Sequence, residues 1–200
     1  MLKDYIIVAR EEDEPIERLV FENESLEAAD LSGIDFDKVR FHHCTFPFCD
    51  FSKSRFYDCL FDGCDLSNGV FTGCYIRGST FRGCKGLGLD LRKSRFKNSA
   101  LADCLFRFAN CSRTEWEACR IEGCDFLEAY FPEVTFKKTT LERVDLRKAV
   151  LLNTLLQEVD VSSCKIEGMV LSDTFRELRG MKISAIQAME LVGYLGVELV

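Results

Sequence analysis

Large apolar residues occupy every fifth position from Ile16 to Leu171, and this spacing is the most regular feature of the chain. Only Gly86 and Cys111 interrupt the series. Fourteen of the 17 phenylalanines fall in this phase. A period of five fits neither the 3.6-residue period of a helix nor the two-residue period of a flat strand. The pattern therefore predicts a chain that turns every five residues and directs each large side chain inward.

A second series places a small residue two positions before each large one. It contains ten of the 11 cysteines. Six of these cysteines follow a spacing of 20 residues that only Val144 interrupts: Cys44, Cys64, Cys84, Cys104, Cys124 and Cys164. Because 20 residues make four sides of five, the sequence predicts a square coil with a column of cysteines along one corner.

Glycine and proline mark the turns of this coil. Eight of the 13 glycines lie two positions after a large residue, where a type II turn needs a positive φ: Gly33, Gly63, Gly73, Gly78, Gly83, Gly88, Gly123 and Gly168. Pro47 and Pro132 lie one position after a large residue, where the fixed φ of proline suits the turn. The turn residues and the core spacing therefore agree.

The segment Gly86–Leu89 breaks both series, because glycine takes a large site and Leu89 a small one. We expect a locally bulged side with compensating packing; the alternative is a contact site for a partner.

This spacing resembles the pentapeptide-repeat family over about residues 21–174. The resemblance implies an all-β solenoid, a right-handed quadrilateral β-helix whose coils bury their large side chains against one another. The expected core stack includes Phe36, Phe56, Phe96, Trp116 and Phe136. We expect residues 1–20 to form an acidic N-terminal cap and residues 175–200 a C-terminal helix and strand.

The five-residue count stops after Leu171–Thr174, and a helical pattern begins at Ser184. Ser184 and Gln187 fit a capping box, apolar residues follow at helical spacing, and Gly196 suits the position after the helix. The apolar arc is wider than a lid alone requires. We therefore expect the helix to join two copies of the chain; the alternative is that it only plugs the last coil.

The C-terminal segment resembles a narrower branch of the family. Gly180–Ile183, Gln187–Ala188, Leu195–Val197 and the closing Leu199–Val200 are similar to the end of Qnr-type and MfpA-like topoisomerase-protecting proteins. This resemblance implies a homodimer that binds DNA gyrase or topoisomerase IV and relieves inhibition by quinolones or other gyrase inhibitors. It places the dimer contact on Ile183, Ile186, Met189, Leu191, Val192, Tyr194 and Leu195. The alternative function is a structural scaffold for an unrelated partner.

Charge modifies this picture. Residues 1–30 contain ten acidic and three basic residues and so account for the whole net charge of −7. A protein that imitates duplex DNA would need a comparable negative charge. The tube is about 34 Å long, and DNA of that length carries about 20 negative charges, so we do not expect mimicry by bulk charge. A candidate partner-binding acidic surface comprises Glu115, Glu117, Glu122, Asp125, Glu128 and Glu133. A basic band precedes it: Arg77, Arg82, Lys85, Arg92, Lys93, Arg95, Lys97 and Arg107. The acidic pI and the lack of basic-aromatic interleaving along the chain argue against direct nucleic-acid binding.

The sequence offers no catalytic motif and no phosphate-binding loop, and a filled interior leaves no room for a cofactor. A metal ladder in the cysteine column is the alternative to structural thiols, but CxxC pairs are absent and His42 and His43 fall at outward positions. We therefore expect a non-enzymatic protein without metal or cofactor. The first ten residues lack the apolar run of an export signal, so we expect a cytoplasmic location and no membrane contact.

Overall fold

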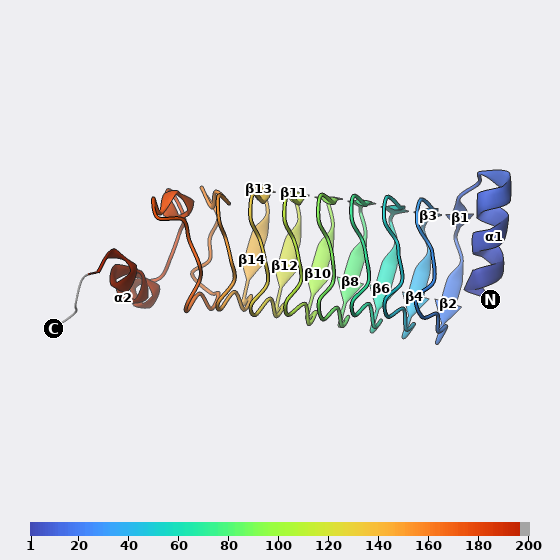
Figure 1. Cartoon of the computed structure of the whole chain (residues 1–200), viewed down its shortest axis with the longest axis horizontal. Coiled ribbons are helices and arrows are strands. Elements are labelled where there is room, and N and C mark those ends of the chain that lie inside the picture. The colour runs from blue at the N-terminus through green and yellow to red at the C-terminus, as the bar shows by residue number, and fades with distance from the viewer. Residues whose placement is uncertain (197–200) are drawn as a thin grey trace.

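The computed structural model describes residues 1–196, without the side chain of Leu195. It is an elongated parallel β-solenoid with a helix at each end (Figure 1). Helix α1 (Leu2–Glu12) lies at the N-terminal end. Two short 3-10 helices, η1 (Arg176–Leu178) and η2 (Gly193–Leu195), and helix α2 (Ala185–Val192) lie at the other. The expected solenoid is confirmed; the strand expected after Gly196 lies outside the described residues.

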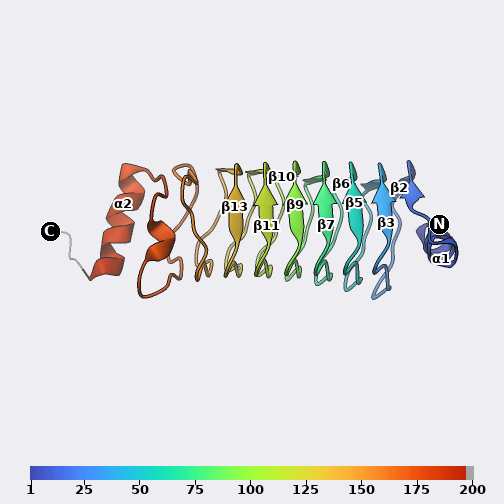
Figure 2. The same ribbon diagram turned by 90° about the horizontal axis from the view of Figure 1, so that it is seen from above.

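Two seven-stranded parallel sheets form two sides of the tube. The first, sheet A, lies toward the viewer in Figure 2 and consists of β1 (Ile16–Glu17), β3 (Asp35–Asp37), β5 (Arg55–Tyr57), β7 (Tyr75–Arg77), β9 (Arg95–Lys97), β11 (Glu115–Glu117) and β13 (Thr135–Lys137). The second, sheet B, consists of β2 (Val20–Glu22), β4 (Arg40–His42), β6 (Leu60–Asp62), β8 (Thr80–Arg82), β10 (Ala100–Ala102), β12 (Arg120–Glu122) and β14 (Thr140–Glu142). Neighbouring strands pair residues 20 apart, as Phe36 pairs with Phe56, so each coil contains the predicted 20 residues.

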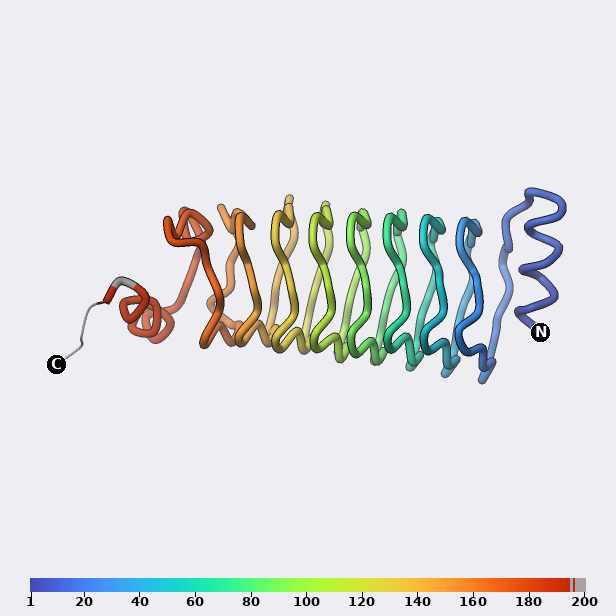
Figure 3. Tube along the Cα trace, viewed as in Figure 1, coloured from blue at the N-terminus to red at the C-terminus, as the bar shows by residue number. Residues whose placement is uncertain are grey.

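Backbone pairing also runs along the other two sides of the tube. Single bridges join Ser25 to Thr45 on one side and Asp30 to Asp50 on the other, and both series continue at the same 20-residue spacing. Hydrogen bonds of mostly 2.7 to 3.1 Å, such as the 2.7 Å bond from Phe46 N–H to the Asp65 carbonyl, connect the stacked coils that Figure 3 traces. The cross-section is therefore four-sided.

The turns adopt the predicted backbone conformation. The eight turn glycines have φ between 59° and 69°. Non-glycine residues adopt the same left-handed conformation at most other corners, including Ala118 at 52° and Phe108 at 58°. The fold thus imposes a positive φ by position, whatever residue stands there.

Aromatic rings stack along the axis inside the tube. The rings of Phe36 and Phe56 lie 5.0 Å apart at an angle of 2°, and those of Phe96 and Trp116 lie 3.8 Å apart. These four side chains are buried, as predicted. The prediction for Phe136 needs correction, because its side chain is only partly buried and borders an open hollow of about 520 Å³.

The coil at Gly86 remains in register, so the expected bulge is wrong. Lys85 pairs with Leu105, and the Gly86 N–H donates to the Leu105 carbonyl at 2.9 Å. The expected compensating packing is present. A Cβ atom on Gly86 would lie 2.7 Å from the Phe106 ring and 3.1 Å from Leu89 Cδ2, because these two side chains fill the space of the missing large residue.

Candidate functional site

The interior of the tube offers no room for a ligand. Two internal cavities, one bordered by Phe126 and Leu146 and the other by Phe81 and Leu101, each hold about 10 Å³, the volume of one water-sized probe. Within residues 1–196, no group of three or more His, Cys, Asp or Glu side chains is placed to hold a metal ion. Any functional site in this part of the chain must therefore lie on the outside or at the ends.

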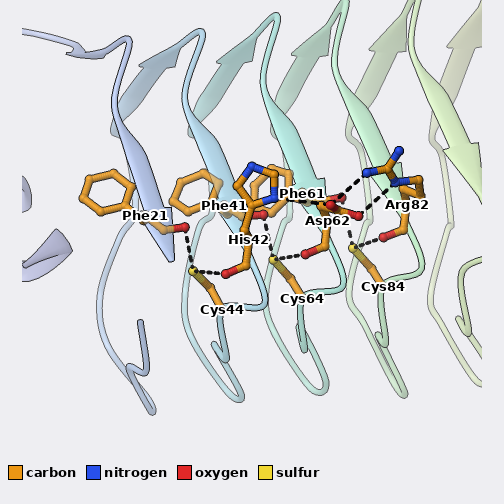
Figure 4. Close-up of polar contacts among 9 residues, drawn as sticks. All are labelled: Phe21, Phe41, His42, Cys44, Phe61, Asp62, Cys64, Arg82 and Cys84. Carbon is orange, nitrogen blue, oxygen red and sulfur yellow. Dashed lines mark hydrogen bonds and ion pairs between the residues drawn. The ribbon is translucent and has the colours of Figure 1, made fainter. Parts of the chain in front are cut away.

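The cysteine column is a row of packed hydrogen-bond donors. Figure 4 shows Cys44, Cys64 and Cys84, whose Sγ atoms donate to the carbonyls of Phe21, Phe41 and Phe61 at 3.3 to 3.4 Å. Elsewhere in the tube, burial raises the pKa of the Cys59 and Cys74 thiols to about 12. A thiol is a metal ligand or nucleophile only as the thiolate, so Cys59 and Cys74 serve packing.

The half-buried His42 belongs to a ladder of polar side chains on the outer face of sheet B (Figure 4). Its Nδ1 lies 3.2 Å from Asp62 Oδ2, and Asp62 also accepts two hydrogen bonds from Arg82 at 2.8 and 2.9 Å. Arg82 holds the pKa of Asp62 at about 2. The ladder joins three consecutive coils, and Asp62 gives His42 a structural partner.

The predicted acidic surface does not form one face, because residues 115–133 make almost a full turn around the tube. Glu115 and Glu117 lie on sheet A, Glu122 on sheet B, and the other three carboxylates on the remaining sides and corners. Each of the six also pairs with a basic residue: Glu115 with Arg95, Glu117 with Lys97, Glu122 with Arg120 and Arg143, Asp125 with Arg107, Glu128 with Lys148, and Glu133 with Arg113. This pairing neutralises the band.

At the C-terminal end, α2 is fixed to the tube by its polar residues. The predicted capping box is present, since the Ser184 side chain accepts from the Gln187 N–H and the Gln187 side chain accepts from the Ser184 N–H. The buried Gln187 amide also donates to the Val161 and Cys164 carbonyls, both at 2.8 Å. The helix thus satisfies carbonyls that a further coil would otherwise pair.

The apolar residues of this end divide into two groups. Ile186 and Met189 are 68% and 55% exposed. Ile183 and Leu191 instead pack against the core of the tube, and the Tyr194 hydroxyl donates to the Met169 carbonyl at 2.8 Å. Val192 is partly buried, and the side chain of Leu195 lies outside the described structure. Among the six predicted contact residues whose side chains the structure describes, Ile186 and Met189 are therefore the exposed ones.

At the N-terminal end, α1 covers the first coil with Leu2, Ile6 and Ala9. The ion pairs that the structure describes within residues 1–30 are Met1 with Asp4 and Arg10 with Asp30. Eight carboxylates in this range therefore remain without an ion pair among the described residues: Glu11, Glu12, Asp13, Glu14, Glu17, Glu22, Glu24 and Glu27. The net charge of the chain is concentrated at this end.

Sequence comparison agrees with this geometry of stacked five-residue sides. Two sequence models match, one described as pentapeptide repeats in eight copies over residues 25–56 and one as a pentapeptide repeat region over residues 54–125. Together they span half of the chain. This chain belongs to the pentapeptide-repeat family.

Solved structures of other pentapeptide-repeat proteins are similar to this one along most of its length. QnrB1, described as a plasmid-mediated fluoroquinolone resistance protein, is 20% identical, with 92% of this chain and 99% of that chain covered and a TM-score of 0.44. HetL, a pentapeptide-repeat protein of the cyanobacterium Nostoc involved in heterocyst differentiation regulation, is 13% identical, with 88% and 95% covered and a TM-score of 0.34. No curated protein sequence matches the chain. None of the helices within residues 1–196 has the length and apolar composition to cross a bilayer.

The sequence analysis missed two features of the ends of this pentapeptide-repeat protein. It did not predict α1, although Leu2, Ile6 and Ala9 recur at helical spacing. It also missed Glu177, whose fully buried carboxylate accepts from the Asn153 N–H at 2.8 Å and the Ser172 hydroxyl at 2.9 Å. In the other coils a backbone carbonyl accepts the hydrogen bond that Glu177 accepts from the Asn153 N–H. No local sequence pattern predicts such a replacement.

Proposed function

We propose that this chain is a non-enzymatic binding protein that engages DNA gyrase or topoisomerase IV and protects it from quinolones or other gyrase inhibitors. The proposal rests on one observation, the C-terminal segment Gly180–Ile183 and Gln187–Ala188 with its similarity to the topoisomerase-protecting branch. The structure supports it by building from this segment a capped helix that ends the tube with an exposed apolar face. The proposed partner is cytoplasmic, and so would be this protein.

We also propose that two chains dimerise through Ile186 and Met189. These two side chains lie one turn apart on α2 and are the exposed large apolar residues of that helix. Leu191 and Ile183 do not suit this role, because they already pack against their own tube. A two-fold axis across α2 would bury the exposed pair against its copy and give a rod of twice the length.

Purified gyrase tests both proposals. Supercoiling and quinolone-stabilised DNA cleavage are measured while the full chain is titrated in, and we expect cleavage to fall with increasing protein. Met189→Glu should halve the mass seen by light scattering and weaken protection. The matched control is Ile7→Glu, an exposed apolar residue of α1 at the opposite end, which should leave the mass unchanged. Unchanged cleavage over a wide range of stoichiometry would rule out the topoisomerase role.

A second candidate function is a scaffold for an unrelated partner. It is favoured by the smooth outer surface of the described tube, where the five-residue register continues from Leu26 to Leu171 without an inserted loop. Capture from a cell lysate distinguishes the two functions. Recovery of a topoisomerase subunit would support protection, and recovery of another protein without any topoisomerase subunit would support the scaffold.

A further inference from the structure

The outer face of sheet A combines aromatic and basic residues over three neighbouring strands, β5, β7 and β9. Each strand presents two outward positions, and strand pairing aligns these positions into two columns. One column runs Arg55, Tyr75, Arg95 and the other runs Tyr57, Arg77, Lys97. The sequence analysis found no basic-aromatic interleaving because the members of each column are 20 residues apart in the chain. The fold brings them to about 4.8 Å spacing.

This part of sheet A carries a local excess of positive charge. The sheet A segments and flanking corners at residues 53–58, 73–78 and 93–98 contain six basic residues and one acidic residue, Asp58. We call this surface the cationic patch; its basic residues are Lys53, Arg55, Arg77, Lys93, Arg95 and Lys97. On sheet B the same coils present one basic and two acidic residues in segments 60–63, 80–83 and 100–103. The charge therefore belongs to one side of the tube.

On the strands of the patch, the outer basic residues are paired and the central one is not. Arg55 bridges outward to Asp35 at 2.6 Å, Arg95 to Glu115 at 3.0 Å and Lys97 to Glu117 at 3.3 Å. Arg77 lies between them and forms no ion pair with any residue that the structure describes. An exposed cation without a counter-ion at the middle of a positive surface is a site for an anion.

The acidic N-terminal end does not cancel this field. The coil of Arg77 lies three coils from the coil of Ile16, which is about 14 Å along the axis. Charges separated by more than about 8 Å in water at physiological ionic strength are largely screened from each other. The net charge of the whole chain therefore does not describe the potential at the patch.

The two tyrosines make a nucleic acid a better ligand than an acidic peptide. Tyr57 and Tyr75 lie side by side at the centre of the patch, with ring centroids 5.9 Å apart, and both are partly exposed. Carboxylates need cations alone, whereas single-stranded nucleic acids offer phosphates to cations and unpaired bases to aromatic rings. A flat face cannot curve around a double helix, so it suits a duplex less well than a single strand. A short, unpaired strand is the anion that uses every group of this surface.

We propose that the cationic patch of sheet A binds a short segment of single-stranded nucleic acid, with Arg77 at its centre and Tyr57 and Tyr75 as stacking surfaces. The nucleic acid would run along the axis of the tube over β5, β7 and β9, which lie side by side in Figure 2. This site is independent of the proposed topoisomerase role, because it uses neither α2 nor the ends of the tube.

Fluorescence anisotropy with a labelled 15-nucleotide oligothymidylate and the full-length protein tests the proposal. Binding should weaken with salt, with a slope of log K against log salt of about −3 for four phosphate contacts. Arg77→Glu should reduce affinity at least about tenfold and lower that slope by about one. The matched control is Arg40→Glu, an exposed strand arginine on sheet B whose substitution makes the same change in net charge. Equal losses in both variants would overturn the site.

The contribution of the rings is tested separately. Tyr75→Ala should weaken oligonucleotide binding by about fivefold or more, while Tyr130→Ala, an exposed tyrosine on another side, should have no effect. A duplex of the same length should bind more weakly than the single strand. Two results would contradict the proposal: no binding of the oligonucleotide at low salt, or its full displacement by an equal charge concentration of polyglutamate, which would indicate an acidic protein ligand instead.

Discussion

At the scale of single residues, the corner position decides the backbone conformation of the tube. Residues as different as Ala118, Phe108 and Lys53 adopt φ values of 52° to 60° there. An L-residue pays a steric penalty in this region that glycine avoids, because its Cβ crowds the following carbonyl. The stacking of the coils therefore holds many residues in a conformation that they would not choose alone.

Ala118→Gly tests this account. Ala118 is exposed, so the substitution removes little packing. We expect a gain of about 0.5–1 kcal/mol in the free energy of unfolding, because relief of the left-handed strain exceeds the added entropy of the unfolded chain. Ala102→Gly in the regular strand β10 is the control and should lose stability. Denaturant titration measures both, and a loss for Ala118→Gly would contradict the strain argument.

The stacked core predicts a large cost for removing one ring. Phe56 is fully buried and contacts Phe36 at 5.0 Å. Phe56→Ala should lower the free energy of unfolding by about 3–5 kcal/mol because neighbouring coils cannot collapse into the hole. The same change at the partly buried Phe136 should lower the free energy of unfolding by less than it does at Phe56. Equal denaturation midpoints for Phe56→Ala and the parent would contradict the prediction.

At the scale of elements, the two ends solve the same problem with different chemistry. Helix α1 covers the first coil with apolar side chains, whereas the C-terminal end satisfies backbone groups with Gln187 and the buried Glu177 carboxylate. Such ends would otherwise expose unpaired strand edges. Because Glu177 lies in η1, this short helix helps to close the C-terminal end of the tube.

Glu177 should make the C-terminal end sensitive to acid. Burial acts to raise the pKa of Glu177, but hydrogen bonds from backbone N–H groups and Ser172 outweigh it, and the pKa is lowered. A group with a lowered folded pKa stabilises the protein above its unfolded pKa of about 4.3, and this contribution disappears as pH falls through the folded value. Glu177→Gln should be less stable at pH 7 and show a smaller stability loss between pH 7 and pH 3. Identical pH profiles by thermal denaturation would contradict this.

At the scale of the whole molecule, each coil contacts only its neighbours, so stability propagates along the axis. Ion pairs follow the same rule, since Asp35–Arg55 and Glu128–Lys148 each join residues 20 apart. The caps then carry a disproportionate role, because they close the only open edges of the described tube.

Removal of residues 175–200 should convert a closed end into a template for pairing. The last coil would lose the Glu177 and Gln187 contacts and expose backbone groups near Val161. We expect soluble yield to fall and light scattering to show open-ended association. Gln187→Ala removes the two amide hydrogen bonds to the tube and the capping-box bond from the Ser184 N–H but leaves the rest of the segment in place, and it should remain soluble with a lower melting temperature. A monodisperse truncated protein would contradict the capping role.

The sequence predicted the core and the turns because both depend on short-range spacing. The position of Phe56 in the stack and the positive φ of Gly63 follow directly from a count of five. Surfaces could not be predicted in this way, because neighbours on one face are 20 residues apart. Glu115 and Glu133 seemed to share a surface and do not, whereas Arg77 and Tyr57 seemed unrelated and lie side by side in register. The packing at Gly86 could not be predicted for the same reason, because the space of the missing large side chain is filled by Phe106, 20 residues away in the next coil.

The buried thiols of this chain can report which coils unfold and in what order. All 11 cysteines are free and buried, and ten of them share one phase of the five-residue repeat between Cys44 and Cys164. A polar alkylating reagent can reach each sulfur only while the coil around it is open. Mass mapping of labelled peptides against time would therefore show whether the tube frays from one end, from both, or unfolds as a single unit.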